Sequence, residues 1–243
     1  MKTDFKMIKY KILLIFTILF LNYNNCYSEN TIITNFKEAK NILYKIYNDL
    51  SIDHTFYCHC KFYNRKITLN ITNDNRGYRT EIEHIVPISY YGKYFKEYYQ
   101  GHHQCDKKGR SCAEKTNKKF RLILSDIYNL QVINGGLNKL RSNKNISEIQ
   151  GELRNFGNCD FELNYKQFEP PQNRKGDIAR TYMYMEYIYK YNIINYNIKS
   201  LILEWDKIDP VDQYECSICK EKEKYQKNEN IFVKYECKKL GLW

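Results

Sequence analysis

The sequence is poor in the residues that interrupt regular structure: only ten of its 243 residues are glycine and only four are proline. So few chain breakers exclude a collagen-like protein and a disordered protein rich in glycine and proline. No internal repeat and no linker-like stretch is present, which argues against a chain of separate modules. With 43% hydrophobic and 28% charged residues, the composition is that of a globular protein of one domain, or of two that are tightly joined.

A long hydrophobic run is also missing. The most apolar stretch, residues 12–21, has ten residues and is too short to cross a membrane as a helix. It follows four lysines, and Cys26 and Ser28 downstream are small residues at the −3 and −1 positions of a cleavage site. We therefore predict a signal peptide over residues 1–28 and a mature domain over residues 29–243 that makes no membrane contact. A short N-terminal anchor is the alternative.

Cysteine, in contrast, is plentiful. Nine cysteines less Cys26 leave eight in the mature chain, and an even number in an exported protein predicts up to four disulfides. The sequence does not choose among the pairings of Cys58, Cys60, Cys105, Cys112, Cys159, Cys216, Cys219 and Cys237. Zinc is the alternative, because two of the pairs are spaced like zinc ligands, but an oxidising compartment favours disulfides.

The chain carries an excess of positive charge. Its formal net charge is +11, and removal of four lysines and Asp4 with the signal peptide takes away +3 and leaves +8. Such a charge attracts polyanions of any sequence through contacts with phosphates. It is compatible with a nucleic-acid partner, and equally with a basic protein that acts at membranes or on acidic polymers.

Hydrophobic periodicity predicts an α+β fold that is mainly helical, with a small antiparallel sheet. Residues 36–50 have helical spacing, with Asn35 as the cap. Short strands are expected over residues 55–71 and a further strand over residues 81–88, closed by Pro87. Further helices are predicted over residues 113–124, over residues 126–140 with a kink at Gly135 and Gly136, after Pro171, and before Asp209. A loop over residues 92–111 is bracketed near its end by Cys105 and Cys112, which can staple it.

The stretch from Glu81 to Pro87 is the most informative about chemistry. Glu83 precedes His84, and such a pair can divide the work: the carboxylate holds a hard cation such as Mg²⁺, while the neutral imidazole takes a proton from a water that attacks phosphorus. Adjacent side chains of a flat strand point to opposite faces, so the pair shares a site only where the strand twists or ends. A solvent-exposed strand end is the alternative interpretation.

Amides follow downstream. Asn129 and Asn138 lie in stretches predicted to be helical, and an asparagine carbonyl oxygen is a suitable second ligand for a metal that prefers oxygen. The alternative is that these asparagines cap helices, as most asparagines near helices do.

Several blocks of the chain resemble the bacterial endonuclease I family of periplasmic and secreted nonspecific nucleases. The blocks lie in the same order and span nearly the whole mature chain: residues 56–60, 81–87, 109–115, 125–130, 137–143 and 176–185. The resemblance implies a disulfide-stapled fold with a ββα-metal catalytic core, in which a strand carries the base and a following helix completes the metal site.

The resemblance also implies a role for each matching residue. His84 corresponds to the general base, Glu83 and Asn138 to the metal ligands, and Arg110 to the arginine that steadies the scissile phosphate. Asn129 is expected to orient the core rather than to bind metal.

The function that this implies is a nonspecific, metal-dependent endonuclease that cuts DNA, with RNA as a second candidate substrate, and leaves 5′-phosphate ends. Mg²⁺ is the expected ion, with Ca²⁺ or Mn²⁺ as alternatives, and the protein is expected to be a monomer in the periplasm or secreted. The loop over residues 94–110 is the candidate for gripping the strand. A catalytically inactive, secreted nucleic-acid-binding protein on the same scaffold is the alternative.

The chain departs from the family pattern in places. Ile82 stands where members often have an aromatic residue, and Val132 where a proline is usual. Gly136 stands where many have a glutamate, and the lost carboxylate is expected to weaken the surroundings of the metal or to change its preference. One cysteine of the common set is missing and Cys219 is additional, so the disulfide pairing cannot be carried over.

Overall fold

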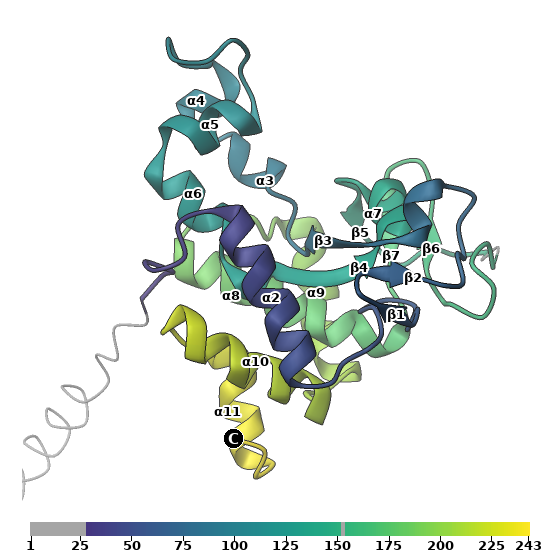
Figure 1. Cartoon of the computed structure of the whole chain (residues 1–243). Coiled ribbons are helices and arrows are strands. Elements are labelled where there is room, and N and C mark those ends of the chain that lie inside the picture. The colour runs from purple at the N-terminus through teal and green to yellow at the C-terminus, as the bar shows by residue number, and fades with distance from the viewer. Residues whose placement is uncertain (1–27, 152–153) are drawn as a thin grey trace, which may run out of the picture.

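The computed structural model describes residues 28–151 and 154–243. The predicted signal peptide, apart from Ser28, lies outside the described residues and stays a prediction. A two-stranded sheet of β3 and β4 lies near the centre of the molecule, with helix α2 crossing in front of it and helices α8 and α9 behind (Figure 1). No helix in the described part of the chain is long and apolar enough to traverse a lipid bilayer.

In this central sheet β3 (Thr80–His84) pairs antiparallel with β4 (Leu130–Asn134), so that His84 lies opposite Leu130. The predicted strand over residues 81–88 therefore exists but ends at His84. Ile82 and Val132 form a cross-strand pair on the face that packs against α2 (Phe36–Asp49). The other face is covered by α7 (Gly135–Arg141). Together β3, β4 and α7 form a ββα unit.

Helix α2 forms as the sequence predicts. Its first turn is closed by Asn35, whose side-chain oxygen accepts a hydrogen bond from the Glu38 amide at 2.8 Å. The buried side of the helix carries Ala39, Leu43 and Ile46, three and four residues apart. The chain before the helix is anchored by Asn30, which is fully buried and donates hydrogen bonds to the carbonyls of Ile33 and Leu122.

The helix predicted over residues 126–140 is wrong. The structure has a short 3-10 turn (Ile127–Asn129), then β4, and only then α7. All five residues of β4 are buried, and a short segment buried on both faces gives no periodic signal that separates a strand from a helix. Asn134 caps α7 by accepting hydrogen bonds from the Gly136 and Leu137 amides.

The two glycines therefore begin α7 instead of kinking a longer helix. A Cβ atom added to Gly136 would lie 2.0 Å from Thr72 Oγ1, and one added to Gly135 would lie 2.5 Å from the Arg76 carbonyl oxygen. The departure from the family's glutamate at position 136 is thus matched by a neighbour, Thr72, that fills the space.

The region between β3 and β4 forms a separate lobe of short helices: α3 (Ser89–Gly92), α4 (Lys96–Tyr99), α5 (Arg110–Thr116) and α6 (Lys118–Leu124). The expected loop over residues 92–111 thus contains α4, and the expected helix over residues 113–124 is two helices, the second capped by Asn117. Figure 1 shows this lobe standing above α2.

Four longer helices make up the C-terminal part: α8 (Lys175–Tyr189), α9 (Tyr196–Ile208), α10 (Gln213–Gln226) and α11 (Ile231–Lys239). The helices predicted after Pro171 and before Asp209 are confirmed as α8 and α9. The remaining elements are short: β1 (Phe62–Tyr63), β2 (Lys66–Ile67), β5 (Asn145–Ile146), β6 (Glu162–Leu163), β7 (Gln167–Glu169) and the 3-10 turns Asn75–Tyr78 and Gln172–Arg174. The fold is α+β and mainly helical, and one of its small sheets also holds a parallel pair, β5 with β7.

Three disulfides staple the described chain: Cys58–Cys159, Cys105–Cys112 and Cys216–Cys237. The predicted staple of the 92–111 loop is confirmed. Cys60 and Cys219 were also disulfide candidates, and this is wrong, because both are buried free thiols. Cys60 contacts the side chains of Thr55 and Asn134 instead of another sulfur. Each zinc-like cysteine pair has one member in a disulfide, so the zinc interpretation does not hold.

Candidate active site

His84 ends β3 and is almost buried, with 8% of its surface exposed. Its Nε2 lies 2.8 Å from the carbonyl oxygen of Leu124, at the end of α6. A carbonyl oxygen only accepts hydrogen bonds, so Nε2 carries the ring proton and Nδ1 keeps a free lone pair. The ring stacks on Phe36 of α2 at a centroid distance of 4.9 Å. The surroundings therefore fix both the orientation and the tautomer of the imidazole.

The charge state of His84 follows from the same surroundings. Burial lowers the pKa of the imidazole to about 3, and the positive charge of Arg110 contributes in the same direction, while the hydrogen bond to Leu124 opposes them. At neutral pH the ring is uncharged and can accept a proton, which is what a general base requires.

Arg110 is the first residue of α5, and its guanidinium lies 4.9 Å from the centre of the Phe36 ring. Phe36 thus contacts both His84 and Arg110, so the structure brings the two sequence-predicted catalytic residues to one aromatic side chain. The short loop closed by Cys105–Cys112 contains Arg110 and fixes the start of α5.

Glu83 lies on the opposite side of the strand, as expected for the neighbour of His84. It is 3% exposed, and its carboxylate lies 3.0 Å from Arg141 Nη1. Neither carboxylate oxygen has a hydrogen-bond partner of good geometry, although Arg141 and Tyr57 are close. Burial raises the pKa of Glu83, and the charge of Arg141 opposes this rise.

Arg141 is a residue that the sequence interpretation missed. Its guanidinium donates hydrogen bonds to the carbonyl oxygens of His84, at 2.8 Å, and of Ile85, and it packs on the Phe168 ring. It therefore holds the backbone of the Glu83–His84 pair while it compensates the charge of Glu83. Its position three residues after Asn138, on one face of the same helix, is a signal that was available in the sequence.

Asn138 projects from α7 toward β3. Its Nδ2 donates to Glu81 Oε2 at 2.9 Å, and Arg76 and Arg79 also bind the Glu81 carboxylate. Glu81 and Glu83 are two residues apart and share the strand face that α7 covers, so Asn138 and Glu83 lie on the same side of β3. His84 contacts α2 on the other side.

These residues fit a hard divalent cation in their chemistry. Glu83 offers a buried carboxylate, of which Oε1 lies against Arg141 and Oε2 has no ion-pair partner among the described residues, and Asn138 offers its carboxamide oxygen, since its amide nitrogen is engaged with Glu81. In residues 28–151 and 154–243, this site included, no three His, Cys, Asp or Glu side chains gather in a way that could hold a metal ion, so the candidate ligands are one carboxylate and one amide.

Asn129 holds the chain that follows the site. Its side-chain oxygen accepts from the Val86 amide at 2.7 Å, and its amide nitrogen donates to the Val86 carbonyl at 3.0 Å. Its own carbonyl accepts from the Ile85 amide. Asn129 thus makes contacts that orient the backbone after His84, and both polar ends of its amide are used for this.

A neutral histidine with a free ring nitrogen, an arginine beside it, and a carboxylate and an amide on a ββα unit are the kinds of group that a phosphodiester hydrolase uses. The profile of the Endonuclease I family matches residues 17–237, and the chain belongs to this family. Among its relatives is an Endonuclease-1 of Buchnera aphidicola subsp. Acyrthosiphon pisum (strain APS), which is 34% identical over 92% of this chain and 90% of its own length. An extracellular and a periplasmic deoxyribonuclease of Aeromonas hydrophila are each 30% identical over 83% of this chain, and over 90% and 86% of their own lengths.

Proposed function

We propose that this protein is an exported, metal-dependent endonuclease that hydrolyses DNA with little regard to sequence. The observation that carries the proposal is the state of His84: a buried, neutral imidazole whose tautomer is set by the Leu124 carbonyl and whose Nδ1 is free to take a proton. A histidine that only packs in a core does not need an arginine against the same aromatic ring. Here His84 and Arg110 both contact Phe36.

In this mechanism Nδ1 of His84 takes a proton from a water molecule as the water attacks phosphorus in line with the leaving oxygen. Arg110 binds the non-bridging oxygens of the phosphate through its planar fork of donors. The bond to the 3′ oxygen breaks, so the new end carries a 5′ phosphate. Glu83 and Asn138 would hold the divalent ion, with Mg²⁺ as the first candidate, which would supply positive charge against the charge that develops during cleavage.

DNA is the proposed substrate, and two observations support it. The Aeromonas relatives are named deoxyribonucleases, and the mature chain carries a net charge of +8, which favours contacts with phosphates. Contacts made to the backbone do not read base edges, so a low sequence preference follows, and RNA remains a second candidate substrate. The loop over residues 94–110 would grip the strand next to Arg110.

The names of the same relatives, one extracellular and one periplasmic, support an exported location. We propose that residues 1–28 are removed as a signal peptide and that residues 29–243 act as one nuclease domain. The disulfides Cys58–Cys159, Cys105–Cys112 and Cys216–Cys237 suit an oxidising compartment.

Cleavage of supercoiled plasmid by the oxidised mature protein tests the proposal, with Mg²⁺, with EDTA, and with His84→Ala. Another histidine, His54, lies outside the site, beside His59 and Asp53, so His54→Ala is the matched control. We expect cutting that needs the metal ion, a loss of at least about 100-fold in His84→Ala, and little change in His54→Ala. DNA binding without cutting under any divalent ion would favour the inactive binding protein instead.

A further inference from the structure

The β1–β2 hairpin lies outside the site described above and has an unusual exposed face. Its two-residue turn, Asn64 and Arg65, has both residues at positive φ, 47° and 64°, and places Tyr63 directly opposite Lys66. Turns of this kind match the twist of the strands, but they favour glycine or asparagine, so Arg65 is held in a backbone conformation that costs free energy. Such conformations are concentrated at functional sites.

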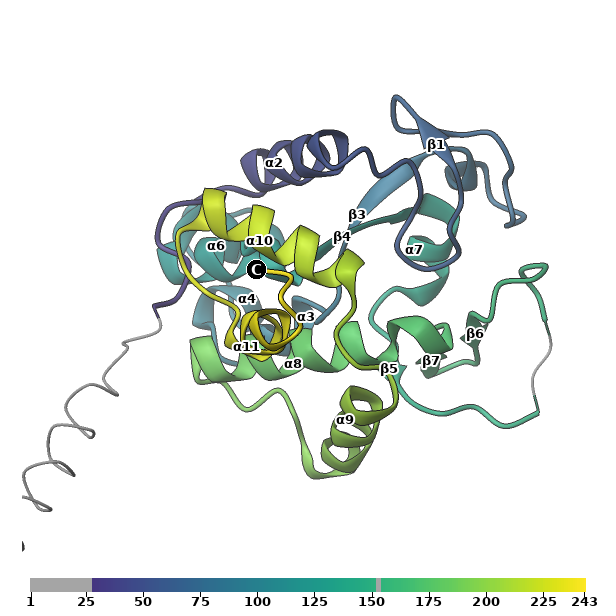
Figure 2. The same ribbon diagram turned by 90° about the horizontal axis from the view of Figure 1, so that it is seen from below.

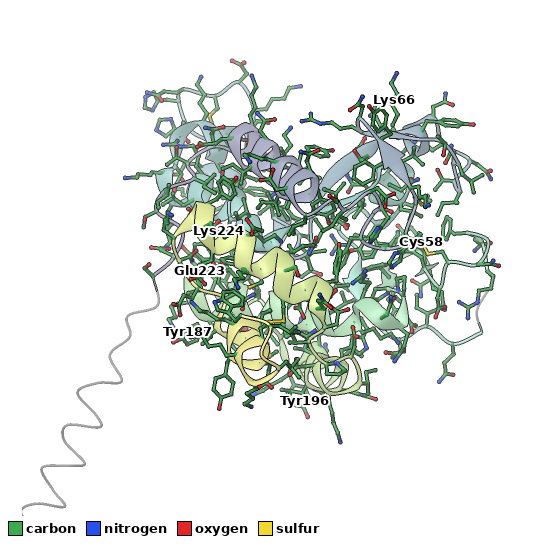
Figure 3. All side chains as sticks on the ribbon, turned by 60° about the horizontal axis from the view of Figure 1, so that its bottom comes forward. Cys58, Lys66, Tyr187, Tyr196, Glu223 and Lys224 are labelled. Atoms are coloured by element: carbon green, nitrogen blue, oxygen red, sulfur yellow. A yellow bond between two sulfur atoms is a disulfide. The ribbon has the colours of Figure 1, made fainter. Side chains whose placement is uncertain are left out.

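The two faces of this hairpin differ in character. Phe62 packs near Tyr47 of α2, and Ile67 is 3% exposed, so this pair forms the inner face. Alternation along the strands then places Lys61, Tyr63 and Lys66 on the other side, which we call the outer hairpin face. All three are exposed, Tyr63 to 79%, and Lys66 projects away from the body of the molecule (Figure 3).

The charge of the outer hairpin face is not compensated. Among the described residues, neither Lys61 nor Lys66 takes part in an ion pair. Asp53 borders this edge through its backbone carbonyl, which accepts from the Phe62 amide, and its carboxylate lies beside His54. Two unpaired ammonium groups that flank an exposed aromatic ring have the chemistry that binds a nucleic-acid backbone, with the ring available for stacking.

The hairpin is fixed to the strand that carries the base. The Thr80 amide donates to the Arg65 carbonyl at 2.9 Å, and the Arg65 guanidinium packs over the Tyr44 ring of α2 at 4.0 Å. Thr80 is the first residue of β3 and His84 the last, so the hairpin begins about 13 Å from the base. With a rise of about 3.4 Å per base pair, this corresponds to about four base pairs.

We infer that the outer hairpin face binds the phosphate backbone of the DNA substrate about four base pairs from the phosphate that is cut. The inference rests on the proposed function. Figure 1 shows α4 and α5 on one side of α2 and the β1–β2 hairpin on the other. DNA held at Arg110 and at the outer hairpin face would therefore be gripped on both sides of the base.

The first test is the salt dependence of DNA binding, measured in the His84→Ala background, where cutting does not interfere. Removing Lys61 and Lys66 together is expected to reduce the slope of log K against log salt by about two, because each phosphate contact contributes about 0.9. The matched control is Lys199→Ala with Lys207→Ala, which removes the same charge from exposed positions of α9. Figure 2 shows α9 on the side of the molecule away from β1.

The second test separates this inference from the proposed function by the length of the substrate. With His84 intact, a duplex of about six base pairs cut near its middle does not reach the hairpin, whereas one of about twenty does. We expect the Lys61/Lys66 double variant to lose kcat/KM on the long duplex and to match the wild type on the short one. If the wild type cuts neither, the proposed function fails. If it cuts both, and the Lys61/Lys66 and Lys199/Lys207 double variants have the same kcat/KM on the long duplex, the hairpin inference is overturned while the nuclease stands.

Discussion

At the scale of single residues, the site depends on which polar atoms of His84 and Glu83 their neighbours occupy. His84 has one ring nitrogen occupied by Leu124 and the other free, while Glu83 has a buried carboxylate beside Arg141. Removing one member of such a buried ion pair leaves the other charge without compensation, which costs about 3–5 kcal/mol. Arg141 is therefore as necessary to the local geometry as the residues that the sequence motif names.

Gly136 offers a residue-scale test of why this chain lacks the family's glutamate. A Cβ at this position would lie 2.0 Å from Thr72 Oγ1, so Gly136→Ala is expected to lower the free energy of unfolding by about 1–3 kcal/mol. Thr72→Ala in the same chain should restore part of the loss, since it removes the nearest atom.

Gly135→Ala is the control for this rescue. Its Cβ would face the backbone carbonyl of Arg76, which Thr72→Ala does not move, so its destabilisation should persist in the double variant. Urea unfolding of the wild type, the two glycine variants and the two double variants with Thr72→Ala measures the effects. A Thr72→Ala rescue of both glycine variants would contradict the steric explanation.

Lys222 gives the protein a pH-dependent stability. It is buried in α10, its ammonium donates to the Leu130 carbonyl at 3.0 Å, and burial lowers its pKa to about 8 from the ordinary 10.5. Between these two values the unfolded chain binds more protons at this residue than the folded chain, so the contribution of Lys222 to stability rises with pH in that window. Below about pH 8 both states are protonated and the contribution is constant.

The measurement is the difference in the free energy of unfolding between wild type and Lys222→Met. We expect this difference to shift in favour of the wild type by up to about 1.4 kcal/mol per pH unit above pH 8. Lys220→Met, at an exposed position of the same helix, should show no such slope. Parallel curves for Lys222→Met and the wild type would rule out the buried lysine as the source.

At the scale of elements, the segment after His84 is held by one side chain. Asn129 satisfies both backbone groups of Val86, so Asn129→Ala leaves a buried amide and a buried carbonyl unpaired. We expect a loss of about 1–3 kcal/mol for each group, together with lower activity because the end of β3 loosens. Asn228→Ala, which removes a buried amide that bonds Ser28 and Tyr184 instead of the backbone after β3, is a comparison for stability. Equal activity losses at equal destabilisation would count against a specific effect of Asn129 on the site.

Whether an element could be predicted from the sequence depends on how many of its faces are buried. Helix α2 was predictable because only one of its sides is buried and because Asn35 and Glu38 mark its start. The strand β4 was not, since it is buried on both faces and is followed at once by the glycines of α7. The roles of His84 and Arg110 came from the family resemblance, and their shared contact with Phe36 depends on packing over more than seventy residues, which no local pattern records.

At the scale of the whole molecule, the net positive charge and its placement determine how DNA would be captured. Basic residues lie on the α4–α5 lobe and on the β1–β2 hairpin, to either side of α2 (Figure 1). We expect kcat/KM on long DNA to fall steeply as salt rises, with kcat at saturating DNA changing much less, because salt competes with phosphate contacts and not with the proton transfer. Steady-state kinetics at several salt concentrations measure this, and an equal fall in both quantities would point to salt acting on the site itself.

Asn30 ties the beginning of the described chain to the active site. It is fully buried and binds the Leu122 carbonyl at 3.1 Å, two residues before the Leu124 carbonyl that sets the tautomer of His84. The proposed cut after Ser28 would leave this hydrogen bond in place, whereas a cut a few residues later would remove it. Under the proposed export, the position of the cut would therefore matter to catalysis: a molecule trimmed a few residues too late would keep every proposed catalytic side chain but lose the hydrogen bond that holds the segment supporting His84.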